Sequence, residues 1–545
     1  MMNRFKRRLY CCCKPLLILF GSLSMLISLF GCDWQSPAPE TKQPQSTLEL
    51  PDQSRYLLKR GLYVSGFTLQ PQQLSDDSQL PLIQDLYEGL VRIDQDGKVQ
   101  GGAAQSWQQQ QYKIWTFQLR PGLRWSNGEP LTAQDFVQSW YALAVQAPDN
   151  PLSEYLRFMA IENAEKVLSK EYGVEMLGIK ALDAETLQIT LSQPMPYLPQ
   201  MLSHVALLPQ YQGESNGTLV SNGAYNLLYR HTTDLLLEKN PFYWDADNVS
   251  FRNVSYHALD SSDNPAHYDL VRQIAGAVQP APLQMQQLAL PTLCSYYYEF
   301  NFRHPRLAQS AVRKALTAMI SLPEINSDIA NIGRINTKFL PRDMQSQQAE
   351  QSWAPTVTEQ LLVQAGVDGG QPLRLRLTYE QQGIHPQLAQ RLIQMLSQSD
   401  LIQIQAQAVT RQQLLQQRMQ GDFDLIASGW CADYPDPSAF FSIFHSRSAN
   451  NKVAYHNPQL DELLQKSVES AVTEAERVQI YQQIEQVINQ EQLVLPLFQY
   501  YNYYLIKSDL AGYASPAATS SLYSRDLYRK ISLTQSEQHP EQTEQ

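Results

Sequence analysis

Cysteine is the residue type in this sequence with the clearest potential for chemistry. Three cysteines lie at positions 11–13, Cys32 follows an apolar stretch near the N-terminus, and only Cys294 and Cys431 occur in the rest of the chain. These two can form one disulfide or remain two buried thiols. No Cys-x-x-Cys, His-x-His or His-x-x-x-His spacing is present, so we expect no metal site, no redox centre and no cofactor.

Catalytic and nucleic-acid-binding functions have little support. The chain has no Gly-rich phosphate loop and no His-Glu-x-x-His pair, and no nucleophile can be matched to a base, so we expect a protein that is not an enzyme. A formal net charge of −11 gives no general attraction for nucleic-acid phosphates. With 545 residues, 43% of them hydrophobic and 17% charged, the chain is expected to fold into two or three domains.

The N-terminal region has the pattern of an export signal. A basic segment precedes the apolar residues 15–30, and one glycine separates these from Cys32, which resembles the cleavage site of bacterial lipoproteins. We expect residues 1–31 to be a lipoprotein signal peptide and Cys32 to be the lipidation site that holds the protein to membrane lipid; the alternative is a buried cysteine near an ordinary cleavage site. Residues 32–50, rich in Pro, Gln and Ser, are expected to form a flexible tether.

The residue after the predicted lipidation site bears on localisation. Asp33 resembles the signal that retains lipoproteins on the inner membrane of enteric-type bacteria. We therefore expect a lipid-anchored protein of the cell envelope, on the periplasmic face of the inner membrane if the source is Gram-negative.

The rest of the chain has mixed α/β patterns. Alternating apolar residues predict a strand at 115–119, and Thr132 begins a capping box that predicts a helix. Alternation at 373–377, a helical stretch near 388–396 and a strand near 402–409 predict a βαβ unit. The remaining expected elements are a helix from Thr410 that Gly421 stops, a strand at 423–427, a capped helix from Thr473 and an aromatic strand at 493–506.

Several blocks of sequence, in order, resemble the large peptide-binding proteins of ABC importers, the peptide/nickel-type solute-binding protein family 5. The blocks are Leu86–Leu90, Trp115–Arg120, Trp125–Gly128, Leu131–Val137, Asn222–Tyr225, Asn240–Trp244, Cys294–Asn301 and Gly429–Tyr434. The last two resemble the periplasmic oligopeptide-binding members more than the dipeptide, nickel or sugar members.

The resemblance implies an α/β, two-lobed solute-binding fold, of the Venus flytrap or type II periplasmic-binding-protein-like class, with an extra inserted domain. The implied parts are lobe I at 51–90, 212–293 and 502–535, the inserted extra domain at 91–211, lobe II at 294–501 and a polar C-terminal tail at 536–545. The resemblance also implies a disulfide between Cys294 and Cys431.

The same resemblance assigns peptide-binding residues. Asp433 matches the aspartate that binds the peptide amino terminus, and its alternative role is to cap the turn before Pro435. The residues implied to pair with the peptide main chain or to line the cleft are Tyr296, Tyr298, Asn301, Gly429, Trp430, Cys431 and Ala432. The alternative is that these form an ordinary hydrophobic strand.

At four further positions the sequence can be compared with the family: two keep the family's residue type and two have lost it. Arg418 and His385 match positions that meet peptide carboxyl termini, although Arg418 could instead end its helix and His385 could be a surface residue. An arginine of the family is replaced by Ala427. An acidic position of the first lobe is replaced near Ser75, where residues 76–77 are both Asp and could compensate.

The resemblance implies that the protein captures oligopeptides between two closing lobes and delivers them to an ABC permease and its ATPase in the inner membrane. It also implies a monomer. Ala427 suggests an alternative, a murein-peptide receptor for cell-wall recycling, because those ligands have unusual linkages and D-residues. A signalling or structural lipoprotein that kept the fold without transport is the third possibility.

Overall fold

The computed structural model describes residues 53–530, except 76, 216, 347–354 and 515–520. The predicted signal peptide, the tether, the lipidation site Cys32 and the polar tail 536–545 lie outside the described residues. Within the described residues, no helix is both long enough and apolar enough to cross a membrane.

Most strands of the described part belong to one mixed sheet of eleven strands. Its strand order is β15 (Ile402–Val409), β14 (Leu373–Glu380), β16 (Leu425–Cys431), β12 (Met285–Phe300), β17 (Val494–Lys507), β11 (Leu270–Arg272), β1 (Leu57–Leu62), β10 (Asn253–Ala258), β9 (Asp234–Lys239) and β8 (Tyr225–Arg230), with β13 (Gly333–Ile335) also paired to β17.

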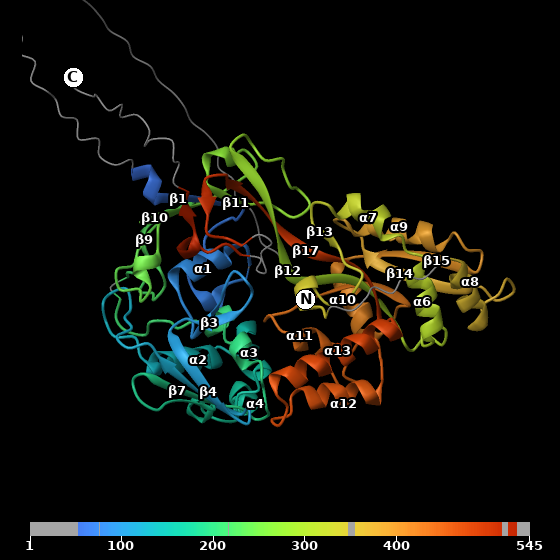
Figure 1. Cartoon of the computed structure of the whole chain (residues 1–545), viewed down its shortest axis with the longest axis horizontal. Helices are drawn as coiled ribbons and strands as arrows, with labels where there is room; N and C mark the ends of the chain where they lie inside the picture. Colours follow the sequence, from blue (N-terminus) through green and yellow to red (C-terminus); the bar gives the residue numbers. More distant parts are fainter. Residues whose placement is uncertain (1–52, 76, 216, 347–354, 515–520, 531–545) are drawn as a thin grey trace, which may run out of the picture. The chain divides into compact units, whose positions relative to one another are not determined.

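Two long antiparallel strands, β12 and β17, join the two ends of this sheet. The second half of β17 pairs with the first half of β12 on one side and with β11 on the other, while the second half of β12 pairs with β16 (Figure 1). The β12–β17 register shifts between Pro291 and Ser295. Side chains fill this break, because Thr292 Oγ1 donates to the carbonyl of Tyr500 at 2.9 Å and Gln499 Nε2 donates to the carbonyl of Thr292 at 2.8 Å.

A separate four-stranded sheet forms within residues 104–190. Its order is β4 (Ala104–Gln110), β5 (Ile114–Leu119), β7 (Thr186–Thr190) and β6 (Ile179–Ala181). Helix α2 (Ala133–Val145) packs on it and begins with the predicted capping box, in which the Thr132 N–H donates to Asp135 at 2.7 Å. The alternation of β5 turns Trp115 and Phe117 into the core.

The predicted βαβ unit is confirmed. Strands β14 and β15 are parallel and are connected by α9 (His385–Leu396), and α10 (Arg411–Gln420) follows. Gly421 ends α10 with a left-handed φ of 71°, as its position predicts. The strand expected at 423–427 starts later and continues to Cys431, because β16 pairs with β12 over its whole length.

The remaining elements surround these sheets. The other helices are α1 (Leu80–Leu86), α3 (Glu154–Phe158), α4 (Ala164–Leu168), α5 (Leu198–Met201), α6 (Ser310–Ala318), α7 (Leu322–Ile329), α8 (Pro355–Gln364), α11 (Ser438–Phe441), α12 (Pro458–Ser467) and the capped α13 (Glu474–Glu491). Two small two-stranded sheets pair β2 (Val91–Ile93) with β3 (Val99–Gly101) and β18 (Leu510–Ala511) with β19 (Tyr528–Arg529).

Candidate ligand-binding site

A cavity of about 550 Å³ lies where β12 and β16 meet the segment that contains α1 and β2. We call it the central cavity. Its walls come from residues within 74–75, 77–97, 203–208, 292–294, 431–435 and 521–525 and from Leu152, so segments far apart in the sequence share it. This volume is in the range of small-molecule sites. Among the described residues, no group of three or more His, Cys, Asp or Glu side chains is arranged to hold a metal ion.

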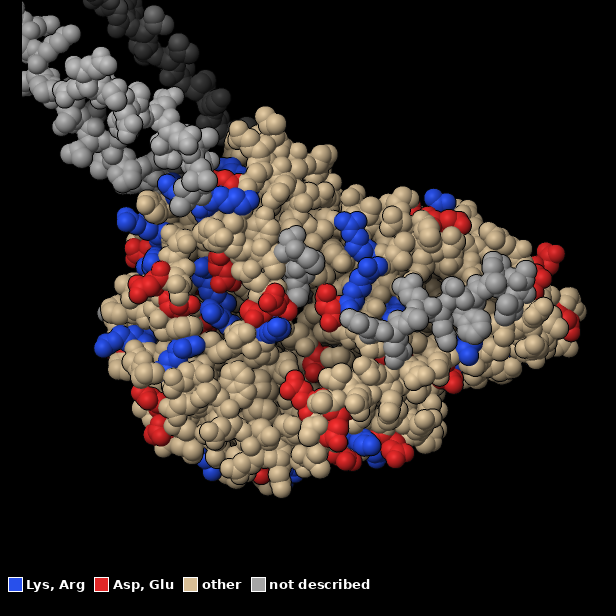
Figure 2. Space-filling model, viewed as in Figure 1, with Lys and Arg blue, Asp and Glu red and all other residues tan. Residues whose placement is uncertain are grey.

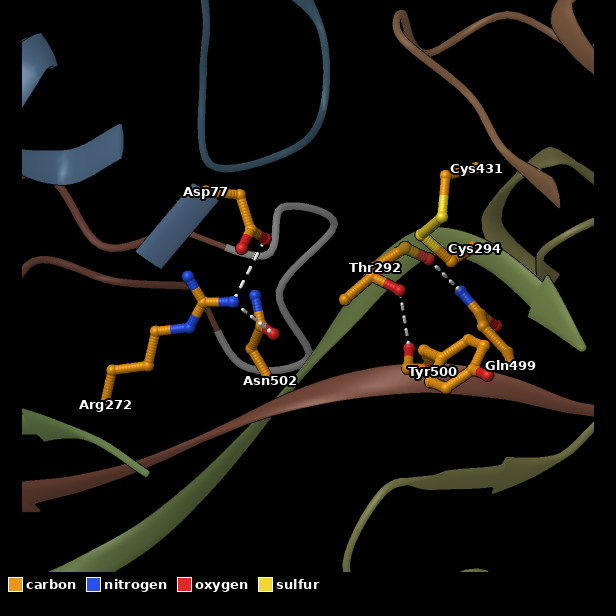
Figure 3. Close-up of a disulfide and its surroundings, with 8 residues drawn as sticks. All are labelled: Asp77, Arg272, Thr292, Cys294, Cys431, Gln499, Tyr500 and Asn502. Atoms are coloured by element: carbon orange, nitrogen blue, oxygen red, sulfur yellow. Dashed lines mark hydrogen bonds and ion pairs between the residues drawn. A yellow bond between two sulfur atoms is a disulfide. The ribbon is translucent and has the colours of Figure 1, made fainter. Parts of the chain in front are cut away.

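The disulfide between Cys294 and Cys431 forms part of the cavity wall (Figure 3). The two residues are direct partners in the antiparallel β12–β16 pair, so the bond closes without moving either backbone. The predicted pairing is therefore confirmed. The bond ties β16 to β12 immediately before the loop that carries Asp433.

Asp433 contributes a bare carboxylate to the cavity. Its side chain is exposed to solvent, and among the described residues it forms neither a hydrogen bond nor an ion pair. The surrounding protein nevertheless removes part of its hydration, which raises the pKa of Asp433 above the usual value. A cation that approaches through the cavity would therefore stabilise the ionised form of the Asp433 carboxylate.

The loop around Asp433 is held in place by its neighbours. Tyr434 is buried and stacks on Tyr197 with ring centroids 5.3 Å apart. The carboxylate of Asp436 accepts hydrogen bonds from the Tyr481 hydroxyl and the Ser438 N–H, both at 2.9 Å. The turn is thus capped by Asp436, which leaves the Asp433 carboxylate unused by the backbone.

One edge of β16 next to Asp433 is open. The N–H of Ala432 donates to the carbonyl of Leu293, so by the antiparallel alternation Gly429 and Cys431 direct their backbone groups away from β12. On that side β14 pairs with β16 only at residues 425–426. Gly429 and Cys431 therefore present N–H and C=O groups to an edge that no described strand occupies.

Tyr296 and His385 lie together, but outside the residues that line the cavity. The Tyr296 hydroxyl and His385 Nδ1 are 2.9 Å apart, and burial lowers the pKa of His385. Glu380 Oε2 lies 3.9 Å from His385 Nε2 and 3.2 Å from Arg411 Nη1. This group sits at the carboxyl ends of β14 and β15, the position where open α/β sheets bind ligands.

Four other predicted residues, Arg418, Asn301, Tyr298 and Trp430, are not among the residues that line the central cavity. Arg418 forms a two-pronged ion pair with Glu299 at 2.7 and 2.8 Å. Asn301 Nδ2 donates to two backbone carbonyls, Tyr298 is fully buried, and the indole N–H of Trp430 donates to a backbone carbonyl at 2.8 Å. Ala432 lines the cavity.

The opposite wall contains the predicted acidic position. Ser75 and Asp77 both line the cavity, and Asp77 accepts a hydrogen bond from Arg272 at 3.0 Å (Figure 3). The same guanidinium donates to Asn502 at 3.0 Å. Asp76 lies outside the described residues.

Four Glu, Arg or His residues of the cavity were not predicted from the sequence: Glu88, Arg92, His204 and Arg525. Glu88 lies in the block Leu86–Leu90, which resembles the family, but nothing in the sequence indicated a role for this glutamate. His204 stacks on Tyr155 with centroids 4.0 Å apart, and burial lowers its pKa to about 4. The sequence contains no local motif around Arg92, His204 or Arg525 that would have indicated them.

Comparisons with known proteins agree with this architecture. Residues 98–452 match the model for bacterial extracellular solute-binding proteins, family 5 middle. The chain is 39% identical over 527 residues to a putative binding protein of Haemophilus influenzae, covering 96% of this chain and 99% of that protein. It is 28% identical to the periplasmic oligopeptide-binding protein OppA of Salmonella typhimurium, covering 94% and 98%.

A solved structure is also similar. The unliganded open form of the periplasmic murein tripeptide-binding protein MppA has a TM-score of 0.79 and 26% sequence identity, covering 87% of this chain and 97% of that chain. The predicted α/β, two-lobed solute-binding fold is thereby confirmed. The chain belongs to family 5 of the bacterial extracellular solute-binding proteins.

Proposed function

We propose that the protein binds peptides by their free amino terminus and their main chain, and presents them to an ABC importer. The observation that carries this proposal is the bare carboxylate of Asp433 in the wall of the central cavity. An α-ammonium group placed there forms a charge-assisted hydrogen bond, which is about twice as strong as a neutral one. It also restores the stabilisation that partial dehydration takes from the carboxylate.

The charges of the cavity support an ammonium group at Asp433 rather than elsewhere. Three carboxylates line the cavity. Asp77 is paired with Arg272, and Glu88 lies within 4 Å of both Arg92 and Arg525. Asp433 is the one among these three that has no cation in the described structure, so a positively charged ligand group is drawn to it.

The open edge of β16 supplies the second part of the proposed mechanism. A peptide that runs beside Gly429 and Cys431 continues the sheet and satisfies their backbone groups. Backbone pairing does not depend on the ligand's side chains, so the protein is expected to accept many sequences. The disulfide keeps this edge at a fixed position relative to Asp433.

The carboxyl end of the ligand is assigned to the group around His385 and Arg411. The Arg411 guanidinium supplies the positive charge and the His385 imidazole a hydrogen-bonding group, and both residues lie at the carboxyl ends of β14 and β15. Arg418 is held by Glu299, so it reaches a ligand only if that pair opens. Tyr296, Tyr298, Asn301 and Trp430 then act as supports of the strand and its surroundings.

A murein peptide is the second candidate ligand. Ala427, which is buried, replaces an arginine that the resemblance leads us to expect, and the relative MppA with the similar solved structure is a murein tripeptide-binding protein. OppA, at 28% identity, is an oligopeptide-binding protein. We rank ordinary oligopeptides first because the amino-terminal and main-chain anchors do not require special linkages.

The proposed setting is the periplasmic side of the inner membrane, with an ABC permease and its ATPase as partners. We also propose that Cys32 is lipidated, that the folded part is a monomer without catalytic activity, and that lobe I, the inserted domain and lobe II have the boundaries predicted from the sequence. The boundaries at 293/294 and 501/502 fall within β12 and β17, beside the register shift. Loss of lipid labelling in Cys32→Ser tests the anchor.

Melting shifts of protein that has been unfolded and refolded to remove bound ligand test the proposed function. Binding stabilises the folded state in proportion to ligand concentration over Kd. Stabilisation by ordinary tri- to pentapeptides supports an oligopeptide receptor, and stabilisation by a murein tripeptide alone supports the second candidate. If neither stabilises the protein, the peptide-binding proposal is wrong.

A further inference from the structure

Two arginines in the central cavity, Arg92 and Arg525, have no hydrogen-bonded acceptor among the described residues. Both face the same carboxylate, that of Glu88, whose Oε1 lies 3.9 Å from Arg92 Nη1 and 3.8 Å from Arg525 Nη1. The second contacts, Arg92 to Asp245 and Arg525 to Asp526, are also 3.8 Å. These distances allow attraction between charges but exceed hydrogen-bond range.

Glu88 is hydrogen-bonded to two other donors and lies beyond hydrogen-bond distance of both arginines. Its carboxylate accepts hydrogen bonds from the Tyr243 hydroxyl and the Trp244 indole N–H. Both donors are neutral, and they hold the carboxylate in the wall, where the Glu88 side chain is 2% exposed. The charge of Glu88 therefore attracts the two guanidinium groups, while its hydrogen bonds in the described structure go to Tyr243 and Trp244.

Other arginines of the same region are bonded directly. Arg272 donates to Asp77 and Asn502, both at 3.0 Å, and Arg418 donates to Glu299 at 2.7 and 2.8 Å. Arg525 is 7% exposed and its Nε is buried without a hydrogen-bond partner in the described structure. Its Nη1 comes no closer than 3.8 Å to a carboxylate of the described residues, and Arg525 lines the cavity, so a ligand acceptor in the cavity would satisfy this guanidinium.

We infer that Arg92 and Arg525 form an anion-receiving pair that reads a carboxylate on the first or second residue of the ligand. The inference rests on the proposed function, because Asp433 in the same cavity fixes the amino terminus. Two residues of extended peptide span about 7 Å, so a carboxylate near the amino terminus stays within the cavity. The planar guanidinium matches a carboxylate in geometry as well as charge.

The ligand class that this arrangement favours has an ammonium and an anionic group close together at its amino-terminal end. Peptides with Asp or Glu at the first or second position belong to it. A peptide in which the second residue is linked through its side chain, leaving a free α-carboxylate, has the same chemistry. On the face of the molecule that Figure 2 shows, acidic and basic side chains are interspersed.

Calorimetric affinities of four tripeptides test the inference: Glu-Ala-Ala, Gln-Ala-Ala, Ala-Glu-Ala and Ala-Gln-Ala. In the wild-type protein, Glu is expected to bind about tenfold more tightly than Gln at one of the two positions. Arg92→Gln should reduce that ratio to about twofold or less. Arg374→Gln, a matched change at an exposed residue of β14 outside the cavity, should keep the wild-type ratio.

The outcomes separate this inference from the proposed function. If all four peptides bind but Glu and Gln are equivalent at both positions, the anion-receiving pair is wrong and peptide binding stands. If none of the four binds, both fail. Arg525→Lys is a second variant, in which the buried positive charge is kept. It should weaken the preference for Glu over Gln because lysine lacks the paired N–H donors of the planar guanidinium. An unchanged preference in both variants would also overturn the assignment.

Discussion

Replacement of Asp433 by Asn removes one negative charge from the central cavity and keeps the size of the side chain. Because Asp433 is exposed and has no partner among the described residues, the substitution leaves no other group of the protein unpaired. The raised pKa of Asp433 means that ionisation is disfavoured in the folded state. The ligand-free variant should therefore be as stable as the wild type, or slightly more stable, at neutral pH.

The effect on binding should be much larger. A hydrogen bond between two charged groups contributes about 1.5–3 kcal/mol, which corresponds to a loss of about 10- to 150-fold in peptide affinity. The lower end applies if solvent still reaches the carboxylate in the complex, and the upper end if the bound peptide excludes it.

Isothermal titration calorimetry of a tetrapeptide with the wild type, Asp433→Asn and Asp400→Asn measures this change in peptide affinity. Asp400 is an exposed aspartate between α9 and β15, outside the cavity, and its substitution controls for net charge. Wild-type affinity in Asp433→Asn, with normal unfolding, would refute the assignment of Asp433 to the peptide amino terminus.

Three further predictions concern pH, the disulfide and a helix end. Peptide affinity should fall as pH drops from about 7 to about 4, because protonation at the raised pKa of Asp433 removes the charge that the ammonium requires, and Asp433→Asn should lose this dependence; an equal pH dependence in both proteins would contradict it. Cys294→Ser with Cys431→Ser, which opens a link across 137 residues, should lower the free energy of unfolding by up to about 5 kcal/mol, and an unchanged urea midpoint would argue against that contribution. Gly421→Ala should cost about 1–2 kcal/mol, because φ is +71° and the new Cβ would lie 2.7 Å from Arg303 Nη1; Gly369→Ala, with nothing within 4 Å and no positive φ, is the control in thermal unfolding, and equal melting temperatures would contradict the strain.

Local patterns predicted much of the secondary structure. The period-two alternation around Trp115 and Phe117, and the capping box at Thr132, correspond to β5 and α2 because side chains within one element decide those features. The end of the strand containing Cys431 was misplaced by four residues. Its extent depends on pairing with β12, more than a hundred residues earlier in the chain, which no local pattern reports.

The site was predictable only in part for the same reason. Cys294, Cys431 and Asp433 lie in blocks that resemble the family, and all three line the central cavity. Arg92 and Arg525 lie more than four hundred residues apart and meet at Glu88 through the folded chain. Their proposed role in the site depends on their distances from the Glu88 carboxylate, and these distances cannot be predicted from composition or from the spacing of residues in the sequence.

The most direct test of the central claim compares one tetrapeptide with a free amino terminus and the same peptide acetylated at that terminus. If Asp433 receives the α-ammonium, acetylation should weaken binding to the wild type by about 10- to 150-fold, and should make little difference in Asp433→Asn. Equal affinity of the free and acetylated peptides for the wild type would contradict the account.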